Sequence, residues 1–110
     1  MILTSKMTEK QFEQRVKKFF KSHNIWYLKV WGGPFQRAGI PDIIACVNGR
    51  FVGVELKSST GRPTELQKWN IEKIKESGGI GLVLYPEQFE EFKKMIEEEL
   101  KKCHSGKAKP

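Results

Sequence analysis

Residues 40–57 read IPDIIACVNGRFVGVELK, and this stretch decides how the chain folds. Two apolar runs, Ile43–Val47 and Phe51–Leu56, flank the dipeptide Asn48-Gly49. An Asn-Gly pair between two such runs is the strongest short-range signal for a type I′ turn, because both turn positions need a positive φ. The stretch therefore predicts a tight β-hairpin.

The turn also sets which residues face each other across this hairpin. If Val47 lies opposite Arg50, then Asp42, the only aspartate in the chain, lies opposite Glu55. Directly opposed residues have Cβ atoms about 4.5–5.5 Å apart, and like charges at that separation repel each other. Alternation along the second strand places Lys57 on the same face as Glu55. The register therefore predicts two acids and a lysine close together.

Three arrangements would make this pair of acids tolerable. Lys57 can neutralise one carboxylate as a structural ion pair, one acid can stay protonated with a raised pKa, or a divalent cation can bridge both carboxylates. Magnesium favours one or two carboxylates together with water and a substrate phosphate. A metal site explains the convergence best, whereas a register error of one residue would separate the acids.

A helix and a strand are expected before the hairpin. Thr8 and Gln11 have the spacing of a capping box. Apolar residues then recur at helical spacing as far as the polar break at 22–24: Phe12, Val16, Phe19 and Phe20. The β-branched and aromatic segment Ile25–Trp31 predicts a strand, which the Gly-Gly-Pro sequence at 32–34 ends.

Three further elements are expected after the hairpin. Residues 64–77 have a helical pattern that ends at two glycines, and residues 80–85 form another apolar strand. Pro86 is expected to start a last helix with the apolar stripe Phe89, Phe92, Met95, Ile96 and Leu100. The order α-β-β-β-α-β-α predicts one α/β domain over residues 1–100. Residues 101–110 are expected to be a basic, flexible tail.

The net charge of +7 is unevenly distributed along the chain. Residues 1–75 carry 14 Lys or Arg against 6 acids, whereas residues 76–100 carry 2 against 7. Each Lys or Arg near a phosphate releases condensed counterions, so a basic surface of this kind suits a polyanion such as nucleic acid. The same charge also serves ordinary solubility.

The sequence also argues against several classes of protein. Its apolar runs fall short of the roughly 20 residues that cross a bilayer, and its first residues lack the apolar core of a signal peptide. Cys46 and Cys103 form no metal or redox motif and suggest free thiols in a reducing compartment. We therefore expect a cytoplasmic protein that makes no membrane contact.

The motifs IPD at 40–42 and VELK at 54–57 resemble the signature of the PD-(D/E)xK nuclease superfamily. Within it, the chain is most similar to the virus-type replication-repair nuclease (VRR-Nuc) domain in its compact form, with archaeal Holliday junction resolvases as further relatives. The resemblance extends from the first helix to Tyr85. It implies a restriction-endonuclease-like α-β-β-β-α-β core with an added C-terminal helix and a mixed central sheet.

The resemblance implies a role for each residue of the motif. Asp42 and Glu55 would be metal ligands, and the carbonyl of Leu56 would complete the coordination. Lys57 would position the attacking water and stabilise charge on the phosphate. The implied metal is Mg²⁺, with Mn²⁺ as a substitute. These roles agree with phosphodiester hydrolysis, which needs an activated water and compensation of charge on the non-bridging oxygens.

The family also places an acid on the first helix, and two glutamates compete for that position. Glu13 borders the apolar stripe beside Phe20. Glu9 follows the expected N-cap, where the helix dipole already explains an acid. We therefore assign the catalytic acid to Glu13.

This branch of the family places a glutamine on the helix after the ExK strand, where the chain has Gln67. The helical pattern puts Gln67 within an apolar stripe formed by Leu66, Ile71 and Ile74. A buried amide needs hydrogen-bond partners. Gln67 is therefore either a satisfied core or capping residue, or it orients Lys57 or the catalytic water, as the resemblance implies.

Further basic residues are candidate DNA contacts. Arg37 lies in the loop from Gly32 to Gly39, which could follow a DNA backbone close to the metal or could be an ordinary mobile loop. Arg62 and Lys68 could meet phosphates. Trp69 could stack on an exposed base, although aromatic residues more often lie in a core.

The expected function is a Mg²⁺-dependent, structure-selective DNA endonuclease, active in DNA repair or in a bacteriophage-infected cell. A four-way (Holliday) junction is the expected substrate. Such junctions are cut symmetrically by paired active sites, so we expect a homodimer. Three alternatives stay open: flap or nick cleavage, cleavage of RNA, and a non-catalytic nucleic-acid-binding module that keeps the fold and the basic surface.

Overall fold

The structure, a computed structural model, describes residues 7–32 and 37–102. Its helices and strands follow the predicted order: α1 (Glu9–Ser22), β1 (Trp26–Lys29), β2 (Ile43–Val47), β3 (Arg50–Leu56), α2 (Glu65–Glu76), β4 (Ile80–Leu84) and α3 (Phe89–Lys101). Pro86–Gln88 form a 3-10 turn, η1, so the prediction that the last α-helix begins at Pro86 is wrong by three residues.

Some predicted boundaries need correction or fall outside the described residues. The loop from Gly32 to Gly39 is described only at Gly32 and from Arg37 onward. The predicted tail is described only at its first two residues, and Lys101 belongs to α3. β1 is shorter than the predicted segment 25–31, although the N–H of Val30 still donates to the carbonyl of Asp42 at 2.8 Å.

The four strands form one mixed sheet in the order β1-β2-β3-β4. The pairs β1–β2 and β2–β3 are antiparallel, whereas β3 and β4 are parallel and are connected through α2. A parallel pair requires such a crossover connection, which explains why a helix separates these two strands in the sequence. The predicted α/β class with a mixed sheet is therefore confirmed.

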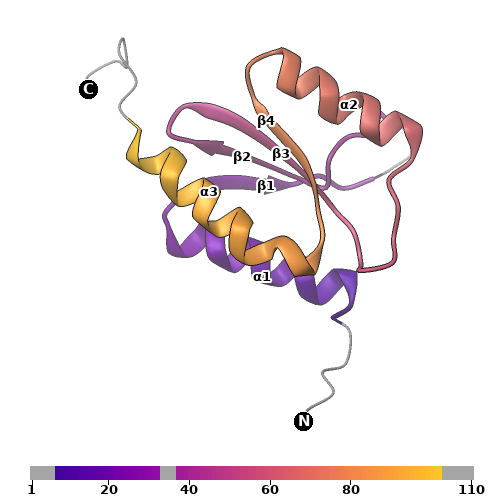
Figure 1. The fold of residues 1–110 in the computed structure, drawn as a ribbon, viewed down its shortest axis with the longest axis horizontal. Helices are drawn as coiled ribbons and strands as arrows, with labels where there is room; N and C mark the ends of the chain where they lie inside the picture. The colour runs from indigo at the N-terminus through magenta and orange to yellow at the C-terminus, as the bar shows by residue number, and fades with distance from the viewer. Residues whose placement is uncertain (1–6, 33–36, 103–110) are drawn as a thin grey trace.

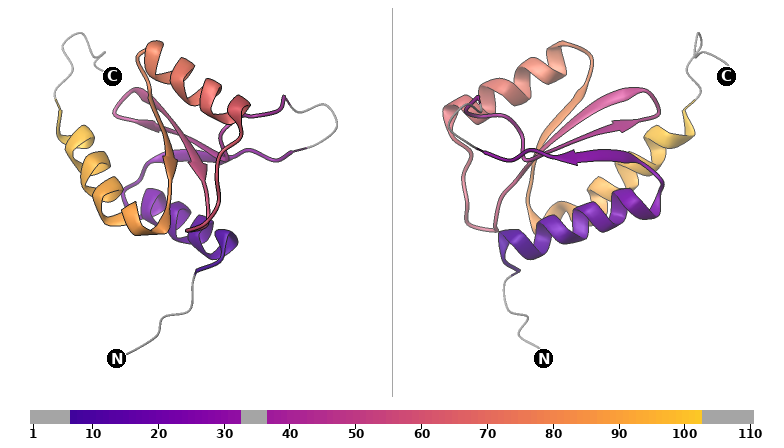
Figure 2. Two further views of the ribbon diagram at one scale, coloured as in Figure 1. Left: turned by 45° about the vertical axis from the view of Figure 1, so that its right-hand side comes forward. Right: turned by 180° about the vertical axis from the view of Figure 1, so that it is seen from behind.

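Helices cover both faces of this sheet. Figures 1 and 2 show α1 and α3 side by side on one face and α2 on the other. The main core lies beneath α1 and α3 and includes the predicted stripe of α1 together with inward-facing strand residues: Phe12, Val16, Phe19, Phe20, Ile43, Val47, Val52, Val54 and Leu56. None of the helices among the described residues is long and apolar enough to cross a bilayer.

The β2–β3 hairpin has the predicted turn and register. Asn48 and Gly49 have φ values of 53° and 83°, as a type I′ turn requires. The paired residues run from Val47 opposite Arg50 to Ile43 opposite Val54. The Asn-Gly signal therefore predicted the register of the two strands correctly.

Helix α2 lies over β3 and β4 and approaches the sheet closely. Gly53 and Gly81 are paired on these strands, and a Cβ atom at either position would lie 2.8 Å from an atom of α2. The contact is made by Ile71, which is buried, and by Ile74. Leu66 is 47% exposed, so the prediction that it belongs to the buried stripe of this helix is wrong.

Candidate active site

Asp42 and Glu55 occupy the open end of the hairpin. Asp42 immediately precedes β2, and continuing the register by one pair beyond Ile43 and Val54 places it opposite Glu55. Alternation puts both acids on the sheet face that carries Gly53, beneath α2. Glu55 is only 2% exposed, whereas Asp42 is half-buried. The predicted juxtaposition of two acids is therefore present.

The main chain holds Asp42 in place from both neighbouring strands. Its Oδ2 accepts a hydrogen bond from the N–H of Leu56 at 2.8 Å, where a continuing strand would offer a backbone carbonyl. Its own carbonyl accepts from Val30. The carbonyl of Leu56 points to the same side of β3 as its N–H, because both groups of one strand residue face the same neighbour. This geometry directs a third oxygen towards the acids.

Glu55 is an incompletely compensated acid. Burial is the main cause that raises its pKa to about 7, and the Asp42 charge adds to it, while Lys57 partly offsets the rise. Its Oε1 atom is buried and has no hydrogen-bond partner among the described residues. A buried oxygen without a partner is unfavourable, so a proton or a cation at this position would stabilise the site.

Lys57 is held beside the acids, as predicted. Its Nζ lies 3.5 Å from Glu55 Oε2, and its side chain is 17% exposed. Its N–H donates to the carbonyl of Leu84 at 3.1 Å, which ties it to β4. Gly61 packs closely against its alkyl chain, since a Cβ there would lie 3.4 Å from Lys57 Cδ. The ammonium group is thus fixed at the edge of the pair.

The oxygen-only donor set fits a hard cation such as Mg²⁺ better than zinc or copper, which favour nitrogen and sulfur ligands. Among residues 7–32 and 37–102, no three or more His, Cys, Asp or Glu side chains gather as a metal cluster. Two carboxylates and one carbonyl oxygen remain, which matches the preference of Mg²⁺ for few protein ligands and several water or phosphate oxygens. The unpartnered Glu55 Oε1 is the atom that such an ion would satisfy.

The structure does not bring Glu13 into this group. Its carboxylate lies 2.6 Å from Lys29 Nζ and 3.2 Å from Lys17 Nζ. Although burial opposes it, these two lysines hold the pKa of Glu13 below its usual value. Lys29 pairs with Ile43, which faces the core beneath α1, so Glu13 is directed to the other sheet face. Glu9, the competing residue, is exposed in the first turn of α1.

Gln67 takes part in a helix cap. Its Oε1 accepts from the N–H of Thr64 at 2.8 Å, and its own N–H donates to Thr64 Oγ1 at 3.1 Å. This is a capping box at the start of α2, the same arrangement that Thr8 and Gln11 form in α1. The structure therefore favours the capping alternative, and the Thr-x-x-Gln spacing could have identified it.

The candidate DNA contacts differ in their distance from the acids. Arg37 lines a cavity of about 340 Å³ together with Asp42. Arg62 lines another hollow formed by residues 59–62 and the start of η1, beside the loop that packs on Lys57. Lys68 forms an exposed ion pair with Glu65 at 2.7 Å. Only Arg37 therefore shares a cavity with an acid of the pair.

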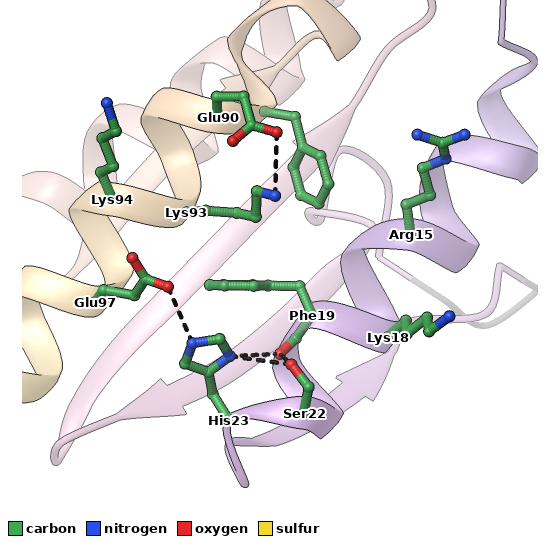
Figure 3. Close-up of a pocket in the computed structure, with 10 residues that line it drawn as sticks. Arg15, Lys18, Phe19, Ser22, His23, Glu90, Lys93, Lys94 and Glu97 are labelled. Carbon is green, nitrogen blue, oxygen red and sulfur yellow. Dashed lines mark hydrogen bonds and ion pairs between the residues drawn. The ribbon is translucent and has the colours of Figure 1, made fainter.

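A separate hollow of about 680 Å³ lies between α1 and α3, on the sheet face opposite α2 (Figure 3). Phe19 contributes to its apolar lining. His23 Nε2 lies 3.1 Å from Glu97 Oε2, and Lys93 pairs with Glu90 at 3.1 Å. The other cations of its rim point away from the hollow in Figure 3: Arg15, Lys18 and Lys94. This hollow contains none of the predicted site residues.

Comparison of the chain with protein-family models, with curated proteins and with solved structures found no match. The site must therefore be interpreted from its own geometry. The resemblance of the IPD and VELK motifs to a nuclease signature stays a prediction.

Proposed function

We propose that this chain is a Mg²⁺-dependent endonuclease that hydrolyses phosphodiester bonds in branched DNA and works as a homodimer. One observation carries the proposal: a buried glutamate, one of whose oxygens has no partner among the described residues, lies opposite the only aspartate of the sequence and beside Lys57. The α-β-β-β-α-β order around it is the one that the PD-(D/E)xK resemblance implies.

Each residue of the site has a role in the proposed reaction. Asp42, Glu55 and the Leu56 carbonyl would hold Mg²⁺, which when bound supplies charge compensation and a water of lowered pKa. Lys57, whose Nζ lies 3.5 Å from Glu55 Oε2, would meet a non-bridging phosphate oxygen with a second positive charge. Water adds to phosphorus, one P–O ester bond breaks, and the leaving oxygen takes up a proton.

The choice of substrate rests on charge and on symmetry. The basic excess over residues 1–75 suits a phosphate backbone. Each copy of the chain carries one acidic pair, and a four-way junction must be cut in two strands, so two copies are needed for one junction. The proposed substrate is therefore a four-way junction or a related branch, bound by a symmetric dimer.

The test incubates the chain with labelled four-way junction, flap, nicked and linear duplexes in Mg²⁺ or in EDTA. We expect the branched substrates to be cut in Mg²⁺ alone. Asp42→Asn and Lys57→Ala should each lower the rate on the order of 10³-fold while junction binding persists. Glu91→Gln, a control at an exposed carboxylate of α3 on the opposite sheet face, should retain the wild-type rate.

Two results would contradict the proposal. If no preparation cuts any substrate with Mg²⁺ or Mn²⁺, the chain is a binding module rather than an enzyme. If a matched RNA is cut faster than the DNA, the assignment of the sugar is wrong. Sedimentation tests the dimer separately, since a strict monomer at assay concentrations would favour flap or nick cleavage over symmetric junction cutting.

A further inference from the structure

A second cavity adjoins the candidate active site on the α2 side of the sheet. It has a volume of about 310 Å³. Its lining comes from α2, from the start of β3, from the loop before β2 and from the connection between α2 and β4, and includes Arg37, Phe51, Trp69, Lys73, Ser77 and Gly79. This volume is at the small end of the range for ligand sites, so the cavity suits one small group rather than a helix or a duplex.

Arg37 connects this cavity to the acidic pair. The same residue lines the cavity that contains Asp42. Gly39 fixes the segment that carries it, because Gly39 has a φ of +80° and a Cβ there would lie 2.6 Å from Leu66 Cγ and 2.9 Å from Asn70 Nδ2. The two cavities are therefore neighbours, with one arginine between them.

The lining of this second cavity is aromatic and basic. Phe51 and Trp69 are 47% and 50% exposed, which is high for large apolar side chains. Lys73 Nζ lies 5.5 Å from the centroid of the Trp69 ring. Arg37 is the second cation, and no acid of residues 7–32 or 37–102 lines the cavity. On the outer side of α2, by contrast, the hollow beside Trp69 is lined by two acids, Glu65 and Glu72, as well as by Lys68.

We propose that this cavity binds one unpaired nucleotide of the DNA substrate. This inference rests on the proposed nuclease function. The base would stack on Trp69 and Phe51, since every base has a π-face and aromatic side chains bind it without sequence preference. Arg37 and Lys73 would meet the adjoining phosphate. Because Arg37 also borders the Asp42 cavity, a strand held here would extend towards the acidic pair.

This arrangement explains a preference for branched DNA. Bases of an intact duplex are stacked on each other and cannot enter a pocket of one-nucleotide size, whereas strands at a junction, a flap or a gap can supply an unpaired base. The cavity would therefore select the structure of the DNA, while the acidic pair supplies the chemistry.

The test measures binding in EDTA, so that it does not depend on cleavage. Oligonucleotides carry the fluorescent base 2-aminopurine at the unpaired position of a flap or within a matched full duplex. We expect fluorescence quenching and tight binding for the flap only. Trp69→Ala and Phe51→Ala should each weaken flap binding roughly tenfold, because stacking on one aromatic side chain contributes that much, and should leave duplex binding unchanged.

Trp26→Ala is the matched control. Trp26 is a 60% exposed tryptophan of β1 that lies outside the lining of the cavity. The Trp26→Ala variant should bind the flap as the wild type does. If Trp26→Ala weakens binding as much as Trp69→Ala, the open sheet face rather than the cavity holds the strand, and the inference is wrong.

Two further outcomes separate this inference from its premise. If Trp69→Ala weakens flap and duplex binding equally, or turns a dimer into a monomer in sedimentation, the cavity is a general contact or an interface between copies, and the inference fails while the nuclease proposal stands. If the flap binds with the expected quenching but Mg²⁺ produces no cutting of any substrate, the nucleotide site stands and the proposed enzymatic function fails.

Discussion

A glutamate is buried beside a basic side chain at each end of the β2–β3 hairpin, and the two ends shift the pKa of this glutamate in opposite directions. At the turn end, the Glu99 side chain from α3 is 4% exposed and lies 3.2 Å from both Arg50 and Lys102. Burial would raise its pKa, but these two cations hold the pKa of Glu99 below its usual value. The turn end is thus a compensated ion pair.

At the open end, Glu55 is buried to the same degree but is only partly compensated. One lysine lies 3.5 Å away, and Asp42 is its direct neighbour. Burial and the Asp42 charge together raise the pKa of Glu55 to about 7. The comparison shows that burial of an acid is not in itself a functional signal. The signal is a buried acid that its surroundings leave without enough positive charge.

The largest expected effect is on catalysis, and only the substitution at the open end of the hairpin should cause it. Glu55→Gln should lower the rate of junction cutting on the order of 10³-fold, because it removes a proposed metal ligand. Glu99→Gln should leave the cutting rate close to that of the wild type. Rates are measured with labelled junction in Mg²⁺ under single-turnover conditions. Equal losses in both variants would remove the distinction between the ends.

The next effect is on the pH dependence of stability without metal. Because the folded state raises the pKa of Glu55 from 4.5 to about 7, its contribution is fully present below pH 4.5 and is lost as the pH rises through 7. The free energy of unfolding in EDTA should therefore fall between pH 5 and 8, by on the order of 2 kcal/mol from this group. Urea unfolding at several pH values measures it.

The matched variant and the metal isolate this contribution. Glu55→Gln has no charge to lose and should show a flatter pH profile, with higher stability than the wild type at pH 8. Addition of Mg²⁺ should restore the stability of the wild type at pH 8 and leave that of the variant unchanged. A profile that is identical in wild type and variant would show that Glu55 is compensated after all.

At the turn end the same kind of substitution should act in the other direction. Glu99→Gln leaves Arg50 and Lys102 without their shared carboxylate, and these cations are 37% and 56% exposed. Partial solvation limits the loss to roughly 1–2 kcal/mol of unfolding free energy. Chemical denaturation at pH 8 is the measurement. A gain in stability, as expected for Glu55→Gln, would show that the ends do not differ.

The sequence predicted the open end well because its signals are local. The Asn48-Gly49 turn determines the register, and the register alone places Asp42 opposite Glu55. The order of elements follows equally from capping boxes, glycine stops and apolar periodicity. These features are determined by neighbours in the chain, so no knowledge of tertiary contacts is needed.

The surroundings of Glu13 and Leu66 depend on contacts that periodicity does not encode. Glu13 does border the apolar stripe of α1, but Lys29 from β1 reaches it there. Leu66 is exposed because α2 contacts the sheet over the glycine pair Gly53 and Gly81 rather than along a broad apolar face. Both facts depend on how the helices dock on the sheet.

Gln67 sharpens the comparison with the smallest expected effect. The resemblance implies that Gln67 acts at the open end of the hairpin, whereas its contacts with Thr64 make it a capping residue. Gln67→Ala removes one hydrogen bond of the cap and should lower the unfolding free energy by about 0.5–1 kcal/mol, with Thr64→Ala as the matched variant at the other half of the box. Its cutting rate should stay at the wild-type value. If Gln67→Ala instead slows cutting a hundredfold or more while Thr64→Ala does not, the glutamine leaves its cap when DNA binds and acts on Lys57 or on the attacking water.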